Sequence, residues 1–83
     1  MKMRRRSDGA VADAFLFQSG FKPVPSWLHD RADVRLPTAE SPMTVQIITG
    51  RWWAVNPNDW IIAHKEGLYL IEDCDIGHTH DEV

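Results

Sequence analysis

The sequence has little cysteine and no long apolar run. Its 83 residues contain one cysteine, Cys74, so a disulfide-stapled secreted scaffold is excluded. No apolar run approaches the roughly 20 residues that a transmembrane helix needs. The basic start of the chain is similar to the first region of a signal peptide, but Asp8 and Asp13 interrupt the apolar region that should follow. These features predict a cytoplasmic protein.

The sequence also lacks the patterns of common catalytic sites. It contains no glycine-rich loop of the kind that binds phosphate groups. Cys74 is flanked by Asp73 and Asp75, whose negative charges should raise the pKa of the thiol and so disfavour the nucleophilic thiolate. We therefore predict that the protein is not an enzyme, with a small metal- or thiol-dependent enzyme as an alternative.

The candidate metal ligands are Cys74, His78 and His80, which occur together near the C-terminal end. Thiolate and imidazole groups are good zinc ligands, and an extended segment would direct both imidazoles to one side. No second group of ligands with matching spacing occurs elsewhere, because His29 and His64 are isolated in the sequence. We predict no metal and no cofactor.

Positive charge is scarce outside a short N-terminal segment. The net charge is −3, with four basic residues within 1–6 and five acidic residues within 72–83. A nucleic-acid-binding protein usually presents a basic face across its domain, so we expect no direct binding of nucleic acid. The pattern predicts a disordered basic tail at 1–9, one β-rich domain at 10–76 and an acidic flexible tail at 77–83.

Short apolar segments separated by turn residues make up the rest of the chain. Strands are predicted at 10–18, 43–49, 52–55, 59–64 and 68–72. A short helix is predicted at about 26–32, with Ser26 as its cap and Trp27 and Leu28 as apolar anchors. The run 60–63 is apolar on both faces and is predicted to be the central strand. The fold class is α+β, a small twisted antiparallel sheet of four or five strands, able to curl like a barrel, with one short helix.

Four turns are predicted from residue type. Turns are expected at Ser19-Gly20 and at Gly50-Arg51. In residues 56–59 the second asparagine tolerates a positive φ, and the Asp59 carboxylate can accept backbone N–H bonds. Residues 65–67 are predicted to be a three-residue hairpin loop, with Gly67 in the left-handed conformation.

The tryptophan pair is the main candidate for a binding surface. Trp52 and Trp53 are adjacent, so on a strand they point to opposite faces. One of them should be exposed, unless the helix covers one face and the loop at 33–42 covers the other. Exposed tryptophan is typical of protein interfaces and of single-stranded nucleic-acid platforms, and the acidic balance favours protein. The second candidate is the acidic segment with Glu72, Asp73 and Asp75.

Several motifs resemble a known group of proteins. Small proteins of tailed bacteriophages and prophages carry Pro-Gly-Asp-Trp-Ile, then a Gly-Glu-x-Tyr hairpin and a terminal Asp-Ile-Phe segment. The corresponding residues here are Pro57-Asn58-Asp59-Trp60-Ile61-Ile62, Gly67-Leu68-Tyr69 and Asp75-Ile76. The N-terminal half resembles the same group through Ala14-Phe15, Gly20 and Pro25-Ser26-Trp27. Asn58 and Leu68 replace the group's glycine and glutamate, and the terminal aromatic residues are absent. The resemblance implies phage origin and a small β-rich fold, without an agreed activity.

The function expected from these features is that of a non-enzymatic phage or prophage accessory protein. It would bind and inhibit a host or defence-system protein in the host cytoplasm, as anti-CRISPR and other anti-defence proteins do. Small acidic proteins can occupy basic nucleic-acid channels, because complementary charge accelerates encounter. The alternative is a minor virion or assembly component.

Overall fold

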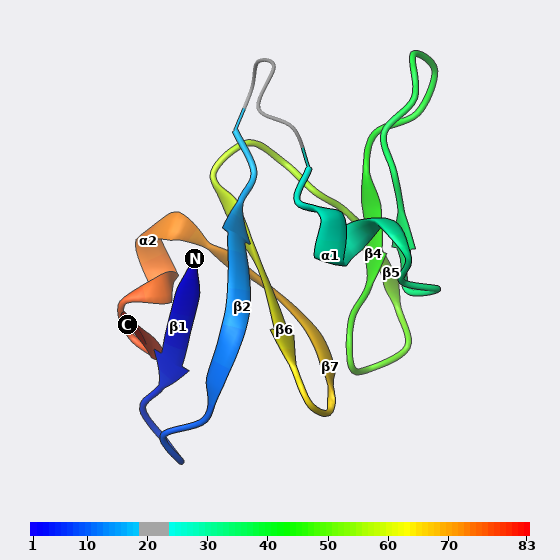
Figure 1. Cartoon of the computed structure of the whole chain (residues 1–83). Coiled ribbons are helices and arrows are strands. Elements are labelled where there is room, and N and C mark those ends of the chain that lie inside the picture. Colours follow the sequence, from blue (N-terminus) through cyan, green and yellow to red (C-terminus); the bar gives the residue numbers. More distant parts are fainter. Residues whose placement is uncertain (19–23) are drawn as a thin grey trace.

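The computed structural model describes residues 1–18 and 24–83. Within these residues the chain forms eight strands in two antiparallel sheets and two short helices (Figure 1). The larger sheet has the order β7-β6-β2-β1-β8, with bounds β1 Lys2–Arg5, β2 Val11–Leu16, β6 Asp59–His64, β7 Gly67–Glu72 and β8 His80–Glu82. The smaller sheet has the order β3-β4-β5, with bounds β3 Val34–Arg35, β4 Thr44–Gln46 and β5 Trp52–Ala54. The helices are α1 Ser26–His29 and α2 Asp73–Ile76. The predicted fold class, a small twisted antiparallel β domain with little helix, is confirmed.

The hairpin of β6 and β7 forms one side of the larger sheet, with β6 inside it and β7 at its edge. β6 lies between β2 and β7, and its run from Asp59 to Ile62 is buried, as predicted for a central strand. The turn before it contains Asn58 at φ 71°, which confirms the predicted positive φ. The loop after it is shorter than predicted, because His64 pairs with Gly67. Gly67 is therefore the first residue of β7, at φ 143°.

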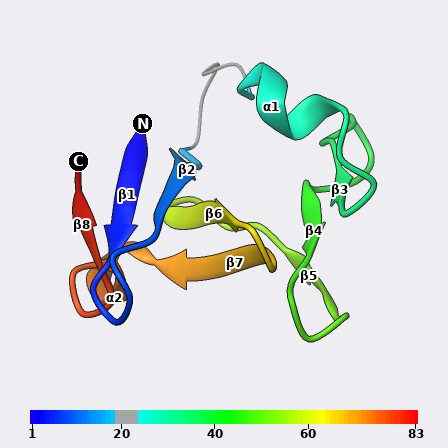
Figure 2. The same ribbon diagram turned by 60° about the horizontal axis from the view of Figure 1, so that its bottom comes forward.

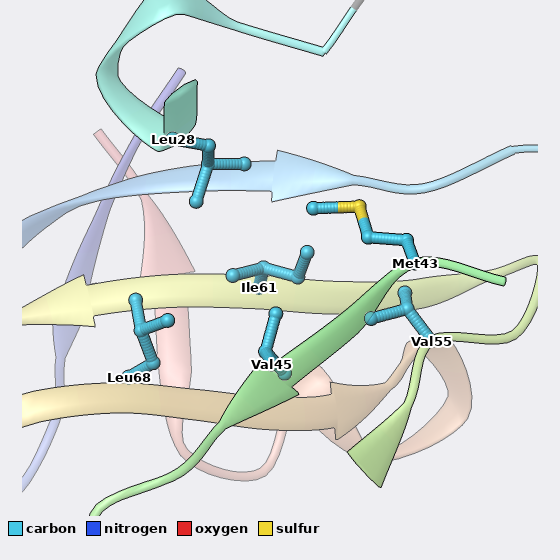
Figure 3. Close-up of a cluster of buried hydrophobic side chains, with 6 residues drawn as sticks. All are labelled: Leu28, Met43, Val45, Val55, Ile61 and Leu68. Carbon is cyan, nitrogen blue, oxygen red and sulfur yellow. The ribbon is translucent and has the colours of Figure 1, made fainter. Parts of the chain in front are cut away.

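The two faces of β6 contribute to separate apolar clusters. Ile61 points to one face and packs between the two sheets (Figure 3). The buried residues of this cluster are Leu28, Met43, Val45, Val55, Ile61 and Leu68. Ile62 points to the other face, where the buried residues are Met3, Ala12, Ala14, Trp60 and Ile62. Successive residues of a strand point to opposite sides, so one apolar run supplies both clusters.

The prediction that both ends of the chain are flexible tails is wrong. Residues 2–5 form β1, and residues 80–82 form β8, which pairs with β1 (Figures 1 and 2). Side chains of β1 alternate between the two faces of the sheet, so Met3 points into the second cluster and its basic neighbours point outward. The acidic end supplies partners for some of that basic charge, as in the ion pair of Arg6 with Asp81 at 2.7 Å.

Smaller differences concern helix and strand ends. α1 stops at His29 instead of continuing to about residue 32, and Ser26 is its first residue instead of its cap. Leu28 is fully buried, as expected of an apolar anchor. The strand predicted at 43–49 ends early because the chain turns, with the Gly50 N–H donating to the Ile47 carbonyl at 2.8 Å. The predicted turn at Ser19-Gly20 lies outside the described residues.

The predicted strands do not form one sheet but are divided between two. β5 pairs with β4 but not with β6, which follows it in sequence. The separation places β5 at the edge of the smaller sheet and β7 at the edge of the larger one. In the described part of the chain, no helix is long and apolar enough to cross a membrane.

Candidate functional site

A hollow lies where the edge strands β5 and β7 approach each other. Its volume is about 290 Å³. It is lined by Ile47, Trp53, Ala54, Asn56, Asp59, Leu70 and Glu72. Apolar and carboxylate groups from the two sheets therefore meet at one concave surface, which we call the edge hollow.

The tryptophan pair behaves as the alternation of a strand predicts. Trp53 is 47% exposed and lines the edge hollow. Trp52 is half-buried, and the Arg35 guanidinium lies over its ring at 4.1 Å from the centroid. The two indoles thus have different surroundings, and only Trp53 presents a largely free surface next to carboxylates.

The three acidic candidates occupy different positions. Glu72 lines the edge hollow. Asp73 lines an adjoining hollow instead and accepts a hydrogen bond from Trp60 Nε1 at 2.8 Å. Asp75 is exposed on α2 and lines neither of these two hollows. The structure therefore brings Trp53 and Glu72 together, gives Asp73 a structural partner, and leaves Asp75 at the periphery.

Asp59 has the structural role that its position in a turn predicts. The residue is buried, and its Oδ2 atom accepts the Asn56 N–H at 2.9 Å. The Asp59 N–H in turn donates to the Asn56 carbonyl at 3.1 Å. These bonds hold the turn that connects β5 to β6, and so they fix one wall of the edge hollow.

Among the described residues, the carboxylates around the edge hollow have no cationic partner. At the N-terminal end, Lys2, Arg5 and Arg6 all form ion pairs with acidic side chains. In the part of the chain that the structure describes, no ion pair involves Asp59, Glu72, Asp73 or Asp75. The basic segment is therefore largely neutralised within the molecule, whereas the acidic segment beside Trp53 keeps its charge.

Cys74 lies next to this surface in an environment that disfavours the thiolate. The charge of Asp75, burial and the hydrogen bond to Glu72, with an Sγ to Oε2 distance of 3.6 Å, raise the pKa of the Cys74 thiol. The direction agrees with the prediction, although Glu72 acts here in place of Asp73. The ligand atoms of Glu72, Cys74 and Asp75 lie within 4.8 Å of one another, all on exposed residues.

Sequence reasoning missed a buried histidine pair. His64 and His80 are 6% and 4% exposed, and their Nε2 atoms lie 2.9 Å apart. The Thr79 hydroxyl lies 2.8 Å from His80 Nδ1. His64 is thus not isolated, and His80 does not belong to a cluster with Cys74. No local signal connects two residues that meet only because β8 returns to the sheet.

Burial lowers the pKa of both imidazoles below the ordinary value. The nearby Arg5 guanidinium adds to the effect for His64, and the neighbouring His64 adds to it for His80. A hydrogen bond between two Nε2 atoms needs one proton between them. The pair therefore tolerates neutral rings but not two imidazolium ions that face each other.

Comparison of the chain with protein-family models, with curated proteins and with solved structures finds no match.

Proposed function

We propose that this protein is a non-enzymatic binding protein whose edge hollow holds a basic segment of a partner protein. The observation that carries the proposal is the position of the exposed Trp53 beside Glu72, which forms no ion pair with any described residue. An arginine or lysine side chain suits this arrangement, because its cation can lie over the indole face and pair with the carboxylate.

The smaller sheet already contains this type of contact. Arg35 lies over the Trp52 ring at 4.1 Å, on the residue next to Trp53. An arginine from a partner would make a similar stacking contact with Trp53. Burial of an exposed tryptophan also favours a protein partner, because tryptophan is enriched among the residues that dominate interface energies.

The acidic surface favours a partner that is itself basic. Glu72, Asp73 and Asp75 would repel the phosphates of nucleic acid, whose binding depends on cationic side chains. The same charges would accelerate encounter with a basic surface, including one that a target uses to bind nucleic acid. In such a case, binding would inhibit the target by occupying that surface.

The resemblance to small tailed-phage and prophage proteins suggests what the target is. We propose a host or defence-system protein in the host cytoplasm, and therefore a role in host takeover or defence, of which anti-CRISPR activity is one form. The raised pKa of the Cys74 thiol supports a role without thiol catalysis.

The test is affinity capture of a partner from host lysate, followed by titration with the purified partner. Trp53→Ala should weaken binding by about thirty-fold or more, the effect of losing about 2 kcal/mol at an interface tryptophan. Glu72→Gln should lower the association rate and its dependence on salt, because it removes a charge at the binding surface.

Two matched variants serve as controls. Val11→Ala truncates an apolar residue of similar exposure on β2, and Asp30→Asn neutralises an exposed carboxylate after α1. Both should bind as the parent protein does. Equal binding by Trp53→Ala and Val11→Ala would refute the proposed surface. A symmetric oligomer without any captured partner would instead favour a virion or assembly component.

A further inference from the structure

The strands that border the edge hollow are both edge strands, and β7 has an open edge. In antiparallel pairing, alternate residues direct their N–H and C=O groups to the same neighbour. The Leu68 carbonyl accepts a hydrogen bond from the Ile48 N–H at 3.1 Å, on the side away from β6. By alternation, the backbone groups of Leu70 and Glu72 also point away from β6. Among the described residues, no backbone group outside β7 bonds to those of Leu70 or to the Glu72 N–H, whereas the Glu72 carbonyl belongs to the N-cap of α2.

The backbone groups of β5 alternate in the same way. The Val55 N–H donates to the Met43 carbonyl at 2.8 Å, and the Ile47 N–H donates to the Arg51 carbonyl at 3.0 Å. Residues 51, 53 and 55 therefore face β4, and the backbone groups of Ala54 face the open side. Ala54, Leu70 and Glu72 all line the edge hollow, so free backbone donors and acceptors from both sheets border the same space.

The chain protects its other edges more fully. β8 is three residues long and carries two exposed carboxylates, and β3 has only two residues. Short and charged strands are common ways of preventing unwanted pairing at a sheet edge. Residues 47–48 already pair with the first half of β7, in parallel at Leu68. The second half of β7 remains open beside Trp53.

We infer that the partner segment binds in an extended conformation and adds a short strand to the open edge of β7, with its basic side chain toward Trp53 and Glu72. This inference rests on the proposed function and specifies how the segment is recognised. In strand addition, backbone hydrogen bonds supply affinity and alternate side chains supply specificity. Here Ile47 and Leu70 form apolar walls that would contact the small or apolar residues of the segment. The Glu72 carboxylate would select its basic side chain.

The inference is tested with a capped pentapeptide of alternating valine and arginine as the probe. Binding should slow amide hydrogen exchange at Leu70 and Glu72, because those N–H groups gain acceptors. A version that is N-methylated at alternate residues keeps the side chains but loses donors. It should bind more weakly by about two- to tenfold for each hydrogen bond lost. A version with glutamate in place of arginine should not bind.

A variant of the protein tests the same contact from the other side. Leu70→Pro removes an N–H that faces the open edge, where proline is tolerated, without removing a bond to β6. Leu70→Ala is the matched control for loss of the side chain, and circular dichroism establishes that both variants are folded. Leu70→Pro should bind the pentapeptide and the captured partner more weakly than Leu70→Ala does.

The outcomes separate this inference from the proposed function. If Trp53→Ala loses the partner while Leu70→Pro and Leu70→Ala bind it equally, the surface is right and strand addition is overturned. If Trp53→Ala also binds normally, the proposed function fails. Equal binding of the N-methylated probe, no binding of the pentapeptide at millimolar concentration, or preferential binding of single-stranded oligothymidine would each overturn the inference.

Discussion

Replacing Trp60 with alanine should destabilise the protein far more than the same change at Trp53. Trp60 is 6% exposed and packs in the cluster on the second face of β6, whereas Trp53 is 47% exposed. Truncation of a buried tryptophan costs about 3–5 kcal/mol. A surface change away from special features usually stays within about 0.5 kcal/mol, and we expect Trp53→Ala to cost less than about 1 kcal/mol.

The magnitude at Trp60 is large relative to the total stability. A protein of this length has an unfolding free energy of roughly 4–12 kcal/mol, from about 0.05–0.15 kcal/mol per residue. For a domain of this size, each kcal/mol lowers Tm by about 4–8 °C. Trp60→Ala should therefore lower Tm by at least about 12 °C, or leave the protein unfolded at room temperature.

The hydrogen bond of Trp60 can be separated from its packing. Trp60 Nε1 donates to Asp73 Oδ1 at 2.8 Å, and Trp60→Phe removes this donor while retaining most of the apolar volume. Because Asp73 is exposed, water can replace the lost donor, and we expect a cost of about 1 kcal/mol. Thermal and urea unfolding followed by circular dichroism at pH 7.5 measures all three variants. A drop in Tm for Trp53→Ala as large as that for Trp60→Ala would refute the assigned positions of the two indoles.

Three further predictions concern the backbone, the C-terminal strand and pH. Valine at Asn58 or Gly67 should cost about 1 kcal/mol or more, because both residues have positive φ, and Asn58→Gly should be nearly neutral in urea unfolding. Removal of residues 77–83 should lower stability by about 1–3 kcal/mol or more in the same assay, because β8 is lost and buried His64 loses its partner. Stability should also fall as pH decreases from about 7 to 5. The pKa of His64 and of His80 is lowered in the folded state, so the unfolded chain binds more protons below the ordinary value near 6.5 and acid favours unfolding.

Each of these predictions has a matched control. Lys65→Val introduces the same side chain in the β6–β7 turn at a residue without positive φ, and it should be close to neutral. Asp81→Asn removes only an exposed ion pair and should lower the unfolding free energy by less than about 1 kcal/mol. If removal of residues 77–83 lowers it by no more than Asp81→Asn does, β8 contributes little to stability. His80→Gln should flatten the pH profile and exposed His78→Gln should leave it unchanged. A profile that is unaffected by His80→Gln would contradict the role of the pair.

The β6–β7 hairpin could be predicted because its signals are local. The run 60–63 is apolar at every position, and its flanking turns contain residues suited to positive φ, as Asn58 shows at φ 71°. The opposite orientations of Trp52 and Trp53 follow from the two-residue period of a strand. The bond of Asp59 to the backbone follows from its place in the turn. Each of these features depends on residues within a few positions of one another.

The ends of the chain and the candidate site depend on contacts between segments that are distant in sequence. β1 and β8 are short and charged, and each becomes a strand because it pairs with the other and, for β1, with β2. The same pairing brings His80 to His64. The division into two sheets places Trp53 beside Glu72. These contacts connect segments that lie far apart in sequence, and their free energy comes from burial and pairing across strands, for which residue type and spacing within one segment carry no signal.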